Sequence, residues 1–99
     1  MQLEIKMMGI QLPDIKELLK RDDLDTAIEQ LNQYIILHTN CDDEPYYLLG
    51  NAYRKAGNWQ MALNNYLEAI SRNPDSPAVT AQKMLMDILE FYNKDMYNQ

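Results

Sequence analysis

The chain has little of what catalytic and metal sites are usually built from. It holds one cysteine, Cys41, and one histidine, His38, so no pair of such ligands stands at zinc spacing. Its three glycines are isolated from one another, which excludes a glycine-rich phosphate loop. No serine, threonine or aspartate pattern indicates a nucleophile with its base. We therefore expect no enzyme activity, no cofactor and no metal, and we interpret His38 as a surface residue at a helix end.

Several locations and partners are also disfavoured. Cys41 cannot form an internal disulfide, and no basic neighbour in the sequence would activate its thiol. No segment approaches the run of about 20 apolar residues that spans a membrane, and charges interrupt the apolar residues at the start of the chain. A net charge of −6 argues against nucleic acid and anionic membranes. We expect a cytoplasmic protein.

Apolar residues recur mainly at helical spacing, between short polar turns. Asp14 with Glu17 predicts a capping box for a first helix, Asp25 predicts the cap of a second, and Pro45 indicates the start of a third. A fourth helix is expected from about Gln60 to Arg72. A fifth is expected after Pro77, with a buried face made of Ala81, Met84, Leu85, Ile88 and Tyr92. Five helices joined by short turns predict an all-α fold of antiparallel hairpins.

The second and fourth helices repeat each other. Five apolar positions match at a constant offset of 35 residues: Leu24 with Trp59, Ala27 with Ala62, Ile28 with Leu63, Leu31 with Tyr66, and Ile35 with Ile70. A periodic amphipathic helix does not by itself explain a shared offset that includes an alanine pair. The chain is therefore expected to contain an internal structural repeat.

The stretch from Tyr46 to Pro74 resembles the tetratricopeptide repeat, whose pattern is W-x₂-L-G-x₂-Y, then A-x₃-F and a late proline. The positions that carry this resemblance are Tyr46, Leu49, Gly50, Tyr53, Trp59, Ala62, Tyr66, Ala69 and Pro74. The small residues would let paired helices approach closely, and the larger ones would fill the space around them. The resemblance implies a short superhelix of stacked hairpins.

The resemblance divides the single domain, residues 1–99, into four parts. Residues 43–76 form the clear repeat, residues 14–39 a degenerate repeat, and residues 77–95 a C-terminal capping helix. Residues 1–12 are expected to form an arm or an extra helical turn.

The resemblance also implies a concave groove, lined by the first helix of each repeat, that binds a peptide or a partner helix. The helix faces that would line it carry Lys16, Lys20, Tyr47, Asn51, Lys55, Lys83 and Met86. Four lysines on one surface of an acidic chain suggest an acidic peptide, although lysines also occupy ordinary solvated faces. Chaperone-binding relatives grip a terminal carboxylate, but Leu48, Ala78 and Gln82 stand at three of the polar positions which that grip requires, so we do not expect it.

An assembly role is the alternative hypothesis. Val79 and Met86 fall off the expected buried face of the last helix, with Phe91 at its edge, and could form an exposed apolar strip. Such a strip would suit a weak homodimer or docking to another chain. The monomeric and dimeric states both stay open at this point.

Overall fold

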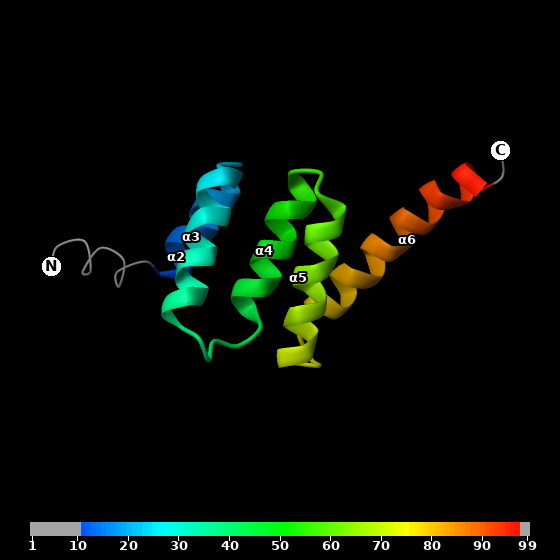
Figure 1. The fold of residues 1–99 in the computed structure, drawn as a ribbon. Helices are drawn as coiled ribbons and strands as arrows, with labels where there is room; N and C mark the ends of the chain where they lie inside the picture. Colours follow the sequence, from blue (N-terminus) through cyan, green and yellow to red (C-terminus); the bar gives the residue numbers. More distant parts are fainter. Residues whose placement is uncertain (1–10, 98–99) are drawn as a thin grey trace, which may run out of the picture.

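The computed structural model describes residues 11–97, with side chains up to Phe91, and this part of the chain forms five helices and no strand. They are α2 (Leu12–Lys20), α3 (Leu24–Leu37), α4 (Glu44–Lys55), α5 (Trp59–Arg72) and α6 (Ala78–Tyr97). Figure 1 shows α2 with α3, and α4 with α5, as neighbouring antiparallel hairpins, while the second half of α6 extends away from them. The predicted all-α fold is confirmed. Most of the arm predicted over residues 1–12 lies outside the described residues, and Leu12 already belongs to α2.

The starts of the first two helices differ from the prediction. The capping box is wrong: α2 begins at Leu12, two residues before Asp14, and its N-cap Gln11 makes no side-chain capping bond. Pro13 explains the earlier start, because proline is tolerated in the first helical turn, where its missing N–H is not needed. Asp25 does not cap α3 either, since that helix begins at Leu24. Both acids lie in a first turn, where they offset the helix dipole.

The first helices of the two hairpins end in the same way. After α4, Gly57 adopts a left-handed φ of 82°, and the Asn58 N–H donates to the Tyr53 carbonyl at 2.9 Å. After α2, Asp22 adopts a φ of 60°, and the Asp23 N–H donates to the Leu18 carbonyl at 3.0 Å. Both are six-to-one bonds of the Schellman type. The motifs are 35 residues apart, so the offset seen in the sequence also relates the two turns.

Two clusters of buried side chains form the core. The first lies between α2, α3 and α4. The second lies between α5 and α6, and side chains of α4 pack against it. Tyr47 and Tyr53 on α4 contact both clusters. The buried members are Ile15, Ala27, Leu31, Leu48 and Leu49 in the first, and Ala62, Tyr66, Ala69, Ala78 and Leu85 in the second.

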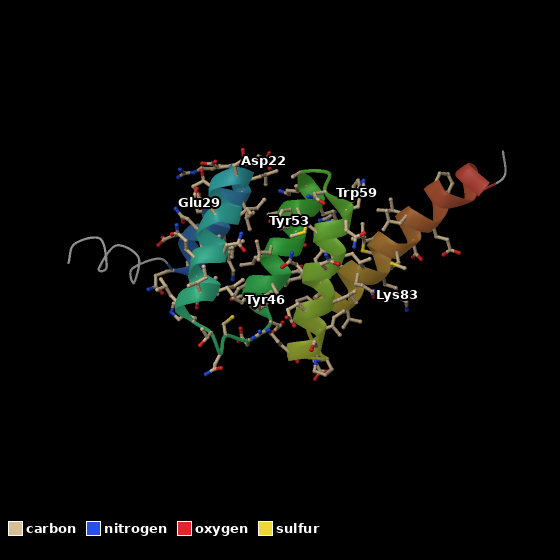
Figure 2. All side chains as sticks on the ribbon, viewed as in Figure 1. Asp22, Glu29, Tyr46, Tyr53, Trp59 and Lys83 are labelled. Atoms are coloured by element: carbon tan, nitrogen blue, oxygen red, sulfur yellow. The ribbon has the colours of Figure 1, made fainter. Side chains whose placement is uncertain are left out.

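The α4–α5 contact depends on a glycine under an aromatic ring. Gly50 is buried, and a Cβ built on it would overlap the Tyr66 ring carbons Cδ1 and Cε1. The Tyr66 side chain is fully buried. Small residues therefore do bring these helices together, as the repeat pattern implies. Trp59 differs from the prediction that it fills the space around the small residues: it is 38% exposed and lies at the start of α5 (Figure 2).

A buried carboxylate connects the start of α4 to the turn between α5 and α6. Asp43 accepts a hydrogen bond from the Asn73 amide at 3.2 Å, and the Ser76 hydroxyl also hydrogen-bonds to it. The Ser76 bond, with a smaller contribution from Asn73, holds the pKa of Asp43 below its ordinary range. The charged carboxylate is therefore the form that stabilises the fold.

We expect this carboxylate to make stability acid-sensitive. Because its pKa is lower in the folded than in the unfolded chain, its contribution is present above about pH 4 and is lost as pH falls through the folded value. Asp43→Asn should lower the urea midpoint at pH 7 and flatten its decline below about pH 4. Asp75→Asn, which changes an exposed carboxylate in the same turn, is the control. Equal effects of the two changes would contradict this prediction.

Candidate functional site

Two adjoining depressions follow one face of the stacked helices. The larger, of about 350 Å³, lies between α4 and α6, and the smaller, of about 170 Å³, lies between α2 and α4. Asn51 and Arg54 on α4 line both, so the two form one groove, which we call the α2–α4–α6 groove. Its other residues are Leu19, Lys20 and Lys55 on the α2 side, and Tyr47, Pro77, Thr80, Ala81, Met84, Leu85 and Ile88 on the α6 side.

The α6 side of the groove is apolar. Met84 is 60% exposed and Ile88 39% exposed, which corrects the prediction that both are buried. The described part of the chain has no helix after α6, so only the side facing α5 is covered. That side carries Ala78 and Leu85, which are fully buried. Met84 and Ile88 instead present apolar surface to the groove, next to the partly buried Tyr47.

The predicted surface of four lysines is not present as such. Lys16 forms an ion pair with Glu44 at 3.0 Å, and Lys55 forms one with Asp22 at 3.3 Å. Lys20 lines the groove and has no carboxylate partner within the described residues. Two of the three lysines on this side are thus largely neutralised by acids of the chain itself.

The structure separates Lys83 and Met86 from the other predicted groove residues. Neither lines the groove. Successive helix residues are rotated by about 100°, which turns both away from the face that carries Met84 and Ile88. Figure 2 shows Lys83 on the side of α6 directed away from α4. Of the predicted residues, Lys20, Tyr47, Asn51 and Lys55 line the groove, and Lys16 lies one helical turn before Lys20.

The floor of the groove holds a chain of hydrogen bonds around Tyr66. The Arg54 Nε donates to the Tyr66 hydroxyl at 3.2 Å, and that hydroxyl donates to Asn51 Oδ1 at 2.6 Å. Burial raises the pKa of Tyr66, so the phenol keeps its proton at neutral pH and can donate it. Sequence reasoning missed Arg54. Its signal was the helical spacing of Tyr47, Asn51 and Arg54, since residues i, i+4 and i+7 share one face.

A third depression lies at the turn between α3 and α4, beside His38 and Cys41. The His38 ring stacks on Tyr34 with centroids 4.0 Å apart. Arg72 donates a hydrogen bond to the Cys41 carbonyl at 2.8 Å. A basic group therefore does lie near this cysteine, although the sequence predicted none. Burial nevertheless outweighs Arg72 and raises the pKa of the Cys41 thiol.

Two further findings concern residues 11–97. Among the side chains described there, those of residues 11–91, no group of three or more histidine, cysteine or acidic side chains is placed to hold a metal ion. No helix in that range is long and apolar enough to cross a membrane.

Stacked antiparallel hairpins with an open groove on one face define a helical repeat protein. The tetratricopeptide repeat family model matches residues 44–76. The chain resembles the Bacteroides fragilis protein BF1650, solved by solution NMR, with 58% sequence identity, a TM-score of 0.80, and 90% of each chain covered. A comparison with curated proteins gives no significant match. The chain belongs to the tetratricopeptide repeat family, and the predicted family is confirmed.

Proposed function

We propose that this chain binds a peptide or helix of another protein in the α2–α4–α6 groove. The family membership supports a role in protein–protein interaction, since tetratricopeptide repeats are generally non-catalytic modules. The observation that carries the proposal is the continuity of the groove over three helices, with apolar side chains exposed on one side and donors on its floor. Concave apolar surfaces with a few placed polar groups are typical of binding sites.

Met84→Asp and Met86→Asp form a matched pair that tests this proposal. Both methionines lie on α6 and are exposed, but only Met84 lines the groove. We expect Met84→Asp to weaken binding of the partner at least about tenfold, because a carboxylate would meet an apolar contact surface. Met86→Asp should bind as the unchanged protein does. Tyr47→Ala is a poorer test, because Tyr47 contacts both core clusters and its loss would also destabilise the fold.

The measurement is quantitative capture from a lysate of the source organism, followed by titration of the captured partner with both variants. Circular dichroism must show that both variants keep their helices. If Met86→Asp alone loses the partner, the interface lies on the outer side of α6 and the groove proposal is wrong.

A specific observation favours that second candidate. Val79 and Met86 are 39% and 43% exposed, and Phe91 is 64% exposed. These side chains would suit an assembly contact through α6, either as a weak homodimer or with another chain. Sedimentation over a range of protein concentrations tests the homodimer: a dimer that Met86→Asp dissociates and Met84→Asp leaves intact would favour it.

A further inference from the structure

The hydrogen bonds on the groove floor fix which atoms are left to meet a ligand. The Tyr66 hydroxyl has one proton, and it already accepts from the Arg54 Nε, so it donates to Asn51. The Asn51 atom that receives this proton must be its oxygen. The Asn51 amide N–H groups and the Arg54 Nη groups make no hydrogen bond to the described residues. The floor therefore offers donors from two neighbouring side chains and lacks a matching acceptor.

Arg54 also stands out by its charge. The chain has three arginines, and two of them have a carboxylate nearby: Arg21 is 3.9 Å from Glu17 and Arg72 is 3.8 Å from Glu68. Arg54 has no such partner among the described side chains, those of residues 11–91, although the chain as a whole carries a net charge of −6. A guanidinium held at Nε by a buried phenol keeps a fixed direction. Such a fork suits a carboxylate, which it can bind with two parallel hydrogen bonds.

The surroundings restrict what can bring that carboxylate. Met84 and Ile88 line the same depression as Arg54, so apolar side chains of the ligand would lie beside its acid. The groove continues on both sides of Asn51 and Arg54, so a chain can pass over them. Relatives that bind the terminal carboxylate of a peptide carry polar side chains at the positions of Leu48 and Ala78. In this chain both residues are apolar and buried in the core. A carboxylate within a peptide fits this site better than one at its end.

We propose that Arg54 and Asn51, held by Tyr66, form a site for the side-chain carboxylate of an aspartate or glutamate in an amphipathic peptide whose neighbouring apolar side chains contact Met84 and Ile88. This rests on the proposed peptide-binding function of the groove and adds the chemistry of the partner. The acid gives orientation and specificity, and the apolar side chains supply buried area. Lys20, which has no carboxylate partner among the described residues, extends the donor side toward α2.

Selection from a phage-displayed library of random dodecapeptides tests the site directly. Each displayed peptide is fused to the phage protein at its C-terminus and so has no free terminal carboxylate. The selection therefore detects only the carboxylates of aspartate and glutamate side chains. On the unchanged protein we expect peptides with an acid within one helical turn of two apolar residues. On Arg54→Met the acidic preference should disappear while the apolar preference remains. Lys83→Met, which removes one exposed positive charge outside the groove, should select the same peptides as the unchanged protein. Met84→Asp should select none.

The contribution of the carboxylate to the affinity is then measured with two synthetic peptides, the selected one and a variant in which its acid is replaced by the amide. Replacing its acid by the amide should weaken binding to the unchanged protein by about tenfold, as expected for a charged hydrogen bond. The two peptides should bind Arg54→Met equally, which a purely structural role of Arg54 would not produce. If the unchanged protein selects apolar peptides without a preference for acids, the carboxylate site is wrong and the proposal that the groove binds a peptide still stands. An acidic preference that survives Arg54→Met would also overturn the site. No enrichment on the unchanged protein would overturn both.

Discussion

Gly50→Ala is expected to destabilise the protein, although alanine is normally the better helix residue. At an exposed helical site this change would favour folding by about 1 kcal/mol. Here the added methyl group would overlap the Tyr66 ring. The ring cannot move aside, because it is fully buried and its hydroxyl is bonded to Asn51 and Arg54. Forcing extra volume into a filled core costs typically about 1–3 kcal/mol, so the sign of the effect reverses.

A double-mutant cycle shows whether the ring is the cause. Tyr66→Leu shortens the side chain opposite Gly50, so Gly50→Ala should cost less in that background than in the unchanged protein. Urea denaturation of the four proteins measures the free energies of unfolding. Gly57→Ala is a useful comparison, because Gly57 has a φ of 82° and open space around it, so its penalty is one of backbone strain alone. A stabilising Gly50→Ala would contradict the close approach of α4 and α5.

The helices and their pairing could be predicted because their signals are local. The turn at Gly57 and Asn58 and the start at Pro45 follow from the conformations that glycine and proline prefer. The repeat pattern then predicted which small residues lie between helices. The predicted caps Asp14 and Asp25 lie three and two residues after the observed caps Gln11 and Asp23, because acids stabilise any place in a first turn and do not by themselves mark the cap.

The groove could be predicted only in part, since its surfaces depend on which faces other helices cover. The apolar stripe of α6 was assigned to the core, but with only α5 against it, Met84 and Ile88 stay exposed. The lysines could be placed on helix faces, whereas their partners Glu44 and Asp22 lie 28 and 33 residues away in the chain. Arg54 acquires its role from Tyr66 on the next helix. The spacing within α4 places Arg54 on the same face as Tyr47 and Asn51, but it does not reveal the contact with Tyr66.

Leu31→Ala is expected to lower the free energy of unfolding by about 2–5 kcal/mol, the usual cost of a buried leucine replaced by alanine. Leu31 is fully buried in the first core cluster, between α3 and its neighbours α2 and α4. Leu67→Ala is the control, because Leu67 lies in the middle of α5 and is exposed. That change should stay within about 0.5 kcal/mol of the unchanged protein.

Which helices lose stability in Leu31→Ala is as informative as the total loss in the free energy of unfolding. In a repeat protein each unit contacts only its neighbours, so stability is lost first where a contact is removed. The two core clusters share only partly buried side chains, Tyr47 and Tyr53. We therefore expect Leu31→Ala to speed native-state hydrogen exchange in α2 and α3 more than in α5 and the first half of α6. An equal increase in all helices would show instead that the tyrosine contacts on α4 couple the two hairpins into one cooperative unit.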